Sequence, residues 1–340
     1  MKIEEDIKLD FNDVLIRPKR STMSSRSEVN LVRTFKFPNS GQEWTGVPVI
    51  AANMDTVGTY DVYKELSKHK IITAMHKFYS VEDYKQMDLN KEYFMVSTGI
   101  NENDLIRLQD IVSAIDVKFI CIDVANGYMS KLCEFCSKVR ELYPDKIIVA
   151  GNVVTREITE DLILRGKVDI VKCGIGPGSA CLTRTQTGVG MPQLSAIMEC
   201  SDAAHGVNGF IIGDGGITCP GDMAKAFCGG SDFVMMGGQF AGHDENPGDV
   251  IEEAGQKYKL FYGMSSDTAM KTHYGQMDKY RSSEGRTIKI KYKGKLEDTV
   301  LNYLGGVRST CTYMNAQSIK NMGKCCTFVR VNRQLNTIYA

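Results

Sequence analysis

Short apolar runs rich in β-branched residues recur along the chain, and polar segments of helical length separate them. Apolar runs of about four to eight residues bounded by turn-forming residues are typical of buried strands in a parallel sheet. The pattern predicts eight strands, at residues 47–53, 71–74, 94–98, 118–123, 147–150, 170–172, 210–212 and 233–236. The segments between them have amphipathic spacing and predict helices, notably at residues 61–69, 103–115, 130–143, 157–165 and 221–227.

Eight β/α alternations indicate a closed barrel, so the predicted fold is α/β, of the (β/α)8 or TIM-barrel class. An open doubly wound sheet is the structural alternative. However, no GxGxxG motif follows the first strand, and the count of eight favours closure. Functional residues of a parallel barrel lie at the C-terminal ends of its strands, so those strand ends are the places to search for a site.

We expect residues 1–340 to form a single catalytic barrel domain. An N-terminal arm through about residue 42 precedes the barrel, the barrel covers about residues 43–240, and a flap and C-terminal segment occupy about residues 241–340. Residues 258–285 are rich in glycine, lysine and tyrosine. This mixed polarity predicts a mobile flap over the mouth of the barrel.

Composition narrows the class of partner. Lysine plus arginine equals aspartate plus glutamate at 41 each, so no global field favours nucleic acid or an acidic membrane, and a small molecule is the expected partner. The first ten residues are polar, and no run of eighteen apolar residues occurs. Eleven cysteines are scattered through apolar segments. These features predict a soluble cytoplasmic protein with reduced thiols.

The densest glycine cluster, GIGPGSACLTR at residues 174–184, directly follows the sixth predicted strand. Such a loop points backbone amides and carbonyls at a ligand, so it can bind a phosphate or a bare cation. Amide dipoles that converge on a thiol stabilise the thiolate, which is the nucleophilic form. We therefore predict that Cys181 is a catalytic nucleophile. The alternative is a buried cysteine that only fills space.

Two further glycine motifs follow the seventh and eighth predicted strands, DGG at residues 214–216 and MMGG at 235–238. The loops after the last two strands of a TIM barrel often bind phosphate. Paired glycines expose amide groups without side-chain obstruction, and Asp214 can accept hydrogen bonds from ribose hydroxyls. Plain tight turns are the alternative interpretation.

The loop at 174–184, both glycine motifs and the opening DFNDVLIRP at 10–18 resemble the IMP dehydrogenase and GMP reductase family, and the resemblance covers nearly the whole chain. The segments FYGMSS at 261–266, YRSSEG at 280–285 and GGVRSTCTY at 305–313 are similar to the reductase branch. Dehydrogenases of the family carry inserted CBS modules, whereas only a short predicted helix at about 81–90 fills that position here. They also have MGSLGAM where this chain has MSSDTAM at 264–270.

The resemblance implies an NADPH-dependent oxidoreductase that deaminates GMP to IMP. Cys181 would add to C2 of guanine, ammonia would leave a covalent thioimidate, and hydride from NADPH would complete the reduction. Thr183 and Glu284 would form the proton relay for the leaving ammonia. Two departures from the family pattern occur, Ala180 in place of valine and Leu182 in place of threonine, and neither removes a proposed catalytic group.

The same resemblance implies the binding residues. The phosphate would be held by Ser179, Gly215, Gly216, Gly237 and Gly238, the ribose by Asp214, and the rest of the nucleotide by Gly263, Met264, Ser265, Arg281, Ser282, Ser283 and Gly285. NADPH would contact Ser25, Arg26, Lys77, Asp123, Val124, Ala125, Ile175, Gly176, Ser309, Thr310, Cys311 and Thr312, with Ser25 and Arg26 reaching a neighbouring subunit. A potassium site would involve Gly176, Gly178, Cys181 and Arg184. A homotetramer is the implied assembly.

Two other functions remain open at this point. An IMP dehydrogenase without CBS modules would need a base to activate water, and a catalytically silent nucleotide-binding protein would use the same loops for sensing. The simultaneous presence of Cys181, Thr183 and Glu284 argues against silence. Cys133 and Cys136 form a CxxC motif, but structural zinc needs four ligands and no second pair stands at suitable spacing.

Overall fold

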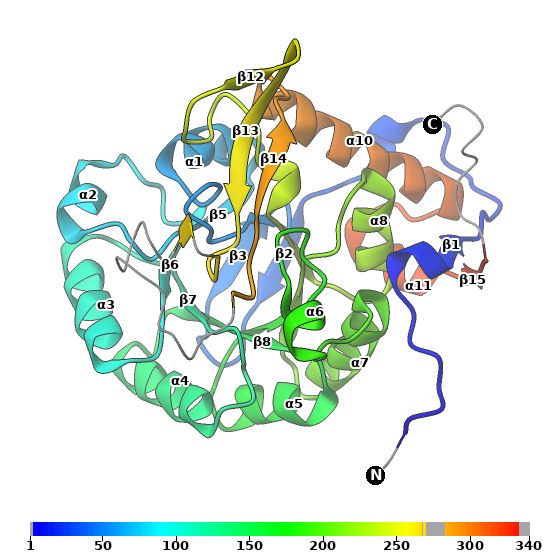
Figure 1. Ribbon diagram of the computed structural model, residues 1–340. Helices are drawn as coiled ribbons and strands as arrows, with labels where there is room; N and C mark the ends of the chain where they lie inside the picture. Colours follow the sequence, from blue (N-terminus) through cyan, green and yellow to red (C-terminus); the bar gives the residue numbers. More distant parts are fainter. Residues whose placement is uncertain (1–2, 267, 270–282, 333–340) are drawn as a thin grey trace.

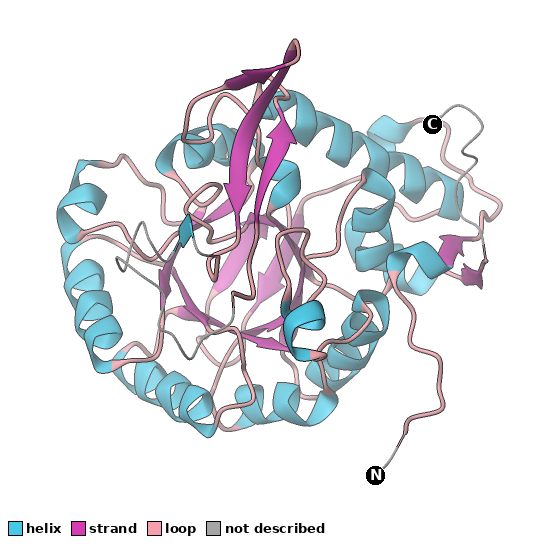
Figure 2. Ribbon diagram, viewed as in Figure 1, coloured by secondary structure: helices cyan, strands magenta, loops and turns pink. Residues whose placement is uncertain are grey.

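The computed structural model describes residues 3–266, 268, 269 and 283–332. Its centre is a closed barrel of eight parallel strands (Figures 1 and 2). In chain order they are β4 (Val49–Ala51), β5 (Ile72–Met75), β6 (Phe94–Thr98), β7 (Phe119–Asp123), β8 (Ile147–Val153), β9 (Ile170–Cys173), β10 (Phe210–Asp214) and β11 (Phe233–Met236). The predicted TIM-barrel fold is confirmed, and each predicted run overlaps one barrel strand.

Two barrel strands extend at least two residues beyond the C-terminal ends of the apolar runs that predicted them. β8 continues through Gly151 to Val153, and β10 continues through Gly213 to Asp214. Gly151 pairs with Asp123 of β7, and Gly213 pairs with Cys173 of β9. Pairing uses backbone groups and does not require apolar side chains. The extensions therefore carry polar side chains to the mouth of the barrel.

Helices surround the barrel on its outer side in Figure 1. They are α1 (Tyr60–Leu66), α2 (Val81–Gln86), α3 (Glu102–Ala114), α4 (Ser130–Leu142), α5 (Arg156–Leu164), α7 (Gln193–Gly206), α8 (Pro220–Cys228) and α10 (Leu296–Met314), with the short α6 (Thr183–Thr187) and α11 (Met322–Cys325). The helices α7 and α10 were not among those predicted from the sequence. Many positions of α7 are Ser, Ala or Gly, so its two faces contrast weakly in hydrophobicity.

An antiparallel hairpin of β2 (Arg33–Lys36) and β3 (Glu43–Gly46) closes the N-terminal end of the barrel. Phe35 and Trp44 of the hairpin are at most 2% exposed and pack with residues of the barrel interior. The ring centroids of Phe35 and Phe233 lie 4.3 Å apart, and the Trp44 indole donates a 2.7 Å hydrogen bond to the carbonyl of Glu92. Aromatic packing fills this end of the barrel, and the cavity described below lies at the other end.

A second sheet, of β12 (Ile251–Glu253), β13 (Gln256–Tyr262) and β14 (Thr287–Lys291), is antiparallel. Its longer strands, β13 and β14, cross the barrel in the view of Figure 1. The segment predicted as a flap, 258–285, therefore begins as strand β13, and its residues 270–282 lie outside the described residues.

Two short strands from opposite parts of the sequence lie side by side. β1 (Val14–Ile16) pairs antiparallel with β15 (Phe328–Arg330), so the N-terminal arm is tied to the C-terminal segment (Figure 1). Among the described residues, no helix combines the length and apolar character that a membrane crossing requires.

The packing of Phe35, Trp44 and Phe233, which we call the aromatic plug, leads to a prediction about stability. Trp44→Ala leaves a cavity against Phe35 and Phe233, so we expect the free energy of unfolding to fall by about 3–5 kcal/mol. Urea denaturation followed by circular dichroism measures this change. Ile106→Ala, at a position that is 55% exposed on α3, is the control and should change stability by less than about 1 kcal/mol. A Trp44 variant as stable as the control would contradict the structural role of the plug.

Candidate active site

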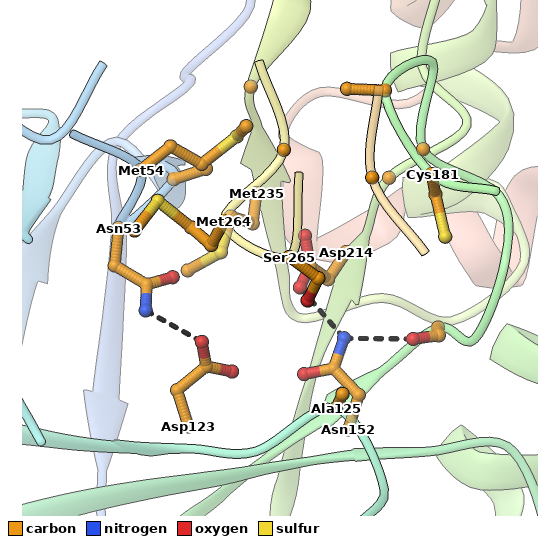
Figure 3. Close-up of a pocket in the computed structure, with 18 of the residues that line it drawn as sticks. Asn53, Met54, Asp123, Ala125, Asn152, Cys181, Asp214, Met235, Met264 and Ser265 are labelled. Carbon is orange, nitrogen blue, oxygen red and sulfur yellow. Dashed lines mark hydrogen bonds between the residues drawn. The ribbon is translucent and has the colours of Figure 1, made fainter. Parts of the chain in front are cut away.

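A cavity of about 1310 Å³ opens at the C-terminal end of the barrel, lined by strand ends and the loops that follow them (Figure 3). One drug-sized ligand typically occupies a pocket of about 300–1000 Å³, so this cavity has room for more than one such ligand. The predicted site residues that line it are Lys77, Asp123, Val124, Ala125, Ile175, Gly176, Gly178, Ser179, Cys181, Thr183, Asp214, Gly215, Gly216, Gly237, Gly238, Gly263, Met264, Ser265, Glu284 and Gly285.

The three predicted catalytic side chains form a continuous hydrogen-bonded line. The Cys181 thiol donates to Thr183 Oγ1 at 3.3 Å. The Thr183 hydroxyl in turn donates to Glu284 Oε2 at 2.6 Å. Cys181 is partly exposed to the cavity. A proton on sulfur can thus pass through a hydroxyl to a carboxylate without leaving the site.

Backbone pairing holds this line together across about a hundred residues of sequence. Cys181 and Gly285 form an antiparallel bridge. The amide of Leu182 donates to the Glu284 carbonyl at 2.6 Å, and the amide of Arg286 donates to the Ala180 carbonyl at 3.0 Å. The Arg286 guanidinium also donates to the Ser179 carbonyl, from Nε at 3.0 Å and from Nη2 at 2.8 Å. The segment 284–286 thereby fixes the end of the glycine-rich loop.

Both the backbone conformation of that loop and its tight packing against neighbouring atoms require glycine. Gly174 and Gly176 have φ values of 150° and 87°, a region that side chains disfavour. A Cβ on Gly174 would lie 2.2 Å from the Asp214 carbonyl oxygen, and one on Gly176 would lie 2.6 Å from Cγ of Arg184. The loop therefore packs directly against the end of β10, which brings Cys181 and Asp214 into the same cavity.

The two glycine motifs meet the loop at a corner of the cavity. Gly215 and Gly216 have φ values of 90° and 80°, and a Cβ on Gly215 would lie 3.1 Å from Pro177 Cγ. A Cβ on Gly238, at the start of the 3-10 helix η4 (Gly238–Phe240), would lie 2.9 Å from Ser179 Oγ. The two glycine motifs and the Ser179 hydroxyl thus border a space that only glycines leave open. This arrangement is suited to a phosphate group.

A lysine supports this corner from behind. Lys293 Nζ donates to the carbonyls of Gly238 at 3.2 Å and Gln239 at 3.1 Å. Burial lowers the pKa of Lys293 to about 8. An anion bound nearby would stabilise the protonated form of this buried amine and raise its pKa.

A network of polar side chains forms the floor of the cavity, and we call Asn53, Asp123, Asn152, Lys172 and Asp214 the polar belt. Lys172 Nζ lies 2.8 Å from Asp123 Oδ1 and 3.0 Å from Asp214 Oδ2. The Asn53 amide donates to Asp123 Oδ2 at 2.8 Å, and the Asn152 amide donates to Asp214 Oδ2 at 2.9 Å. Figure 3 shows Asp123 and Cys181 on different sides of Asp214 and Asn152.

The family follows from comparison with known proteins. A family model described as "IMP dehydrogenase / GMP reductase domain" matches residues 8–335. The chain belongs to the IMP dehydrogenase / GMP reductase family.

Relatives within this family match over their full length. The chain is 56% identical to GMP reductase 1 of Mus musculus over 343 residues, which cover 99% of both chains. It is 54% identical to GMP reductase of Photobacterium profundum over 345 residues, which cover 100% of this chain and 99% of the relative. GMP reductase of Caenorhabditis elegans is also 54% identical, with 99% and 96% covered. The family resemblance predicted from the motifs is confirmed.

Some predicted cofactor residues lie away from the cavity lining. Ser25 and Arg26 are exposed at η2 (Arg26–Glu28). Ser309, Thr310, Cys311 and Thr312 lie on α10, where the side chain of Cys311 is buried. The Arg308 side chain of α10 donates to the Val29 carbonyl directly after η2. The two groups of residues are therefore neighbours of each other. Neither group lines the cavity of the same chain.

Four further predicted residues also lie outside the cavity lining or the described chain. The Ser283 hydroxyl donates to the Gly285 carbonyl at 2.8 Å, which places it behind the segment 284–286. The Arg184 guanidinium donates to the Met191 carbonyl at 2.7 Å, while its stem packs over Gly176. Arg281 and Ser282 lie outside the described residues.

No role in the site was predicted for Lys172, Asn53, Asn152 or Arg286, although both asparagines stand at predicted strand ends. Lys172 did leave a signal, because it is a charged residue in an otherwise apolar strand, Ile170–Cys173. A lysine in such a run is costly unless carboxylates surround it. The asparagines follow apolar runs of the sequence, as many turn residues do, and only the folded chain shows that they contact Asp123 and Asp214.

The accessibility of Cys181 can be tested by thiol alkylation. Burial raises the pKa of the Cys121 thiol to about 12, whereas Cys181 borders the cavity. At pH 8, iodoacetamide should modify Cys181 at least about a hundredfold faster than Cys121, because alkylation requires an accessible thiolate. Peptide mass spectrometry of timed samples measures both rates, and Cys181→Ala identifies the labelled peptide. Equal, slow labelling of the two cysteines would show that Cys181 is not presented to the cavity.

Proposed function

We propose that the protein is a GMP reductase, which converts GMP to IMP with NADPH and releases ammonia. The observation that carries the proposal is the line from Cys181 through Thr183 to Glu284 at the edge of a nucleotide-sized cavity. Full-length identity of 54–56% to proteins named GMP reductase supports it independently.

The first step is displacement of the amino group at C2 of guanine. The Cys181 thiolate forms the C–S bond, while the thiol proton passes to Glu284 through the Thr183 hydroxyl. The relay then returns a proton to the amino group, which leaves as ammonia when the C–N bond breaks. A thioimidate between Cys181 and C2 remains. Covalent addition divides a difficult displacement into two easier steps.

NADPH, when bound, supplies hydride to C2, and the Cys181 thiolate leaves as IMP forms. The cavity has room for a second ligand beside GMP. We assign the nicotinamide end to the part lined by Lys77, Asp123, Val124 and Ala125. Ile175 and Gly176 of the glycine-rich loop would complete this part. For the nucleotide we assign phosphate to Ser179 with Gly215, Gly216, Gly237 and Gly238, ribose to Asp214, and the closing contacts to Gly263, Met264, Ser265 and Gly285.

The remaining cofactor residues indicate a role for a second subunit. Ser25, Arg26 and residues 309–312 neighbour each other outside the cavity lining. We assign them to the NADPH of an adjacent subunit in a homotetramer. An exposed Arg26 can bind the 2′-phosphate bidentately there, which would favour NADPH over NADH.

We assign a potassium site to backbone carbonyls of Gly176, Gly178 and Cys181, with Arg184 beside them. The proposed donors are neutral carbonyl oxygens, which suit a monovalent cation better than a strongly hydrated Mg²⁺. The amide of Cys181 already donates to the Gly178 carbonyl at 3.0 Å, so a cation at this carbonyl would tighten the loop that carries the nucleophile.

The activity test separates the candidate functions. Purified protein with GMP and NADPH should oxidise the cofactor and release ammonia and IMP in equal amounts. Cys181→Ala should lower kcat by on the order of 10³ or more, and calorimetry should find IMP affinity within about threefold of the wild type, since phosphate and ribose contacts come from other residues. NAD reduction with IMP would instead indicate a dehydrogenase, and binding without turnover would indicate a silent protein.

The proton relay makes a second prediction. Glu284→Gln keeps the size of the side chain but removes its ability to take up a proton, so kcat should fall by about 10² to 10⁴ with little change in KM for GMP. Stopped-flow absorbance of NADPH measures the effect, with Glu252→Gln on the exposed edge strand β12 as the matched control. Unchanged kcat in the Glu284 variant would exclude this carboxylate as the relay.

Removal of monovalent cation tests the carbonyl site. Replacing K⁺ by tetramethylammonium at constant ionic strength should lower kcat/KM by at least about fivefold, because the oxygen ligands lose the cation that orders them. Titrating K⁺ back should restore the rate along a saturation curve. Equal rates in both salts would contradict the assignment.

A further inference from the structure

Lys172 occupies a position where a charge is costly. It lies on β9, and its three neighbours in that strand, Ile170, Val171 and Cys173, are 0% exposed, while Lys172 itself is 2% exposed. Removing an ammonium group from water is favourable only when opposite charges and hydrogen bonds compensate it. The compensation comes from two carboxylates on other strands.

One carboxylate comes from β10, the neighbour of β9, and the other from β7, which β8 separates from β9. Asp123 ends β7 and Asp214 ends β10, and their oxygens lie 2.8 and 3.0 Å from the amine. The carboxylates outweigh the effect of burial, which alone would lower the pKa of Lys172, and they raise it above its ordinary value. Lys172 is therefore charged throughout the physiological range.

Under the proposed function, Asp214 belongs to the nucleotide site and Asp123 to the cofactor site. We propose that Lys172 is a positioning residue that serves both sites at once, because a single buried cation orients the ribose-binding carboxylate and the cofactor-binding carboxylate. Loss of this cation should therefore impair binding of GMP and of NADPH together.

The surroundings of Asp123 give the proposal a pH signature. Burial raises the pKa of Asp123. Lys172 lowers this pKa most strongly, and Asn53 and Lys77 lower it further, so the net pKa lies below the ordinary value. The other titratable neighbours are Asp214, an anion, and Cys121, whose raised pKa of about 12 keeps it neutral. Without Lys172, burial and the negative charge of Asp214 both favour protonation of Asp123. Acid would then remove an acceptor that the wild type retains.

The central experiment compares steady-state kinetics of Lys172→Met and Lys172→Arg with the wild type. Lys172→Met should raise KM for both GMP and NADPH by at least about tenfold. On acidification, its kcat/KM should also begin to fall at a higher pH than that of the wild type, because Asp123 is then protonated more readily. Lys172→Arg keeps the charge and should recover most of the affinity for both ligands.

A matched control comes from the opposite end of the barrel. Lys118 pairs with Glu92 at 2.8 Å immediately before β7, so Lys118→Met removes a lysine–carboxylate pair without touching the cavity. It should leave both KM values and the pH profile unchanged. A Lys172→Met variant that folds and behaves like the Lys118 control, or in which only one KM changes, would overturn the proposal.

A second comparison remains informative if Lys172→Met does not fold. Asp123→Asn alone leaves Lys172 beside Asp214, whereas Asp123→Asn with Lys172→Gln removes one charge of each sign and keeps the net charge of the wild-type belt. Calorimetry with IMP alone should show affinity within about threefold of wild type for the single variant and a further loss of at least about tenfold for the double variant. Equal IMP affinities in the two variants would overturn the role of Lys172.

The wild-type measurements keep this test separate from the proposed function. Wild-type protein that fails to oxidise NADPH with GMP refutes the GMP reductase proposal itself. Wild-type activity with Lys172 variants that resemble the Lys118 control refutes only the shared-cation proposal.

Discussion

Closure of the parallel sheet is the constraint on which the rest of the structure depends. β11 pairs with β4, so the last strand of the series bonds to the first and leaves no free edge. Every strand then ends at the same rim, and residues from distant parts of the sequence are forced into one ring. The hairpin with Phe35 and Trp44 fills the opposite end, so the functional cavity and the aromatic plug lie at opposite ends of the barrel.

The catalytic geometry depends on a second long-range contact, made outside the barrel sheet. The segment 284–286 pairs with residues 180–182 through backbone hydrogen bonds on both sides of Cys181. This pairing places the Glu284 carboxylate against Thr183 and leaves the thiol as the end of the relay. The nucleophile and its proton partner therefore come from different parts of the fold, the barrel loop after β9 and the segment before β14.

Charged side chains at the floor of the cavity partly compensate one another. The polar belt contains one cation and two carboxylates, each held by at least one further hydrogen bond or ion pair. A buried ion group of this kind is a costly way to stabilise a fold. It is an effective way to orient acceptors, because Lys172 and the two asparagines hold both carboxylates through ion pairs and hydrogen bonds.

Local patterns were enough to predict the barrel, the glycine-rich loop and the two glycine motifs, because period, strand length and glycine content are local properties that survive into the folded chain. It also indicated the family, through motifs such as residues 174–184 and 280–285. The folded chain was needed to show that Thr183 contacts Glu284, that Arg286 holds the Ser179 carbonyl, and that Lys172 contacts Asp123 and Asp214. These contacts join positions that are tens to a hundred residues apart, and no local pattern specifies which strand end will face which. Ring closure specifies it, because the order and stagger of the strands set the distance between side chains at the rim.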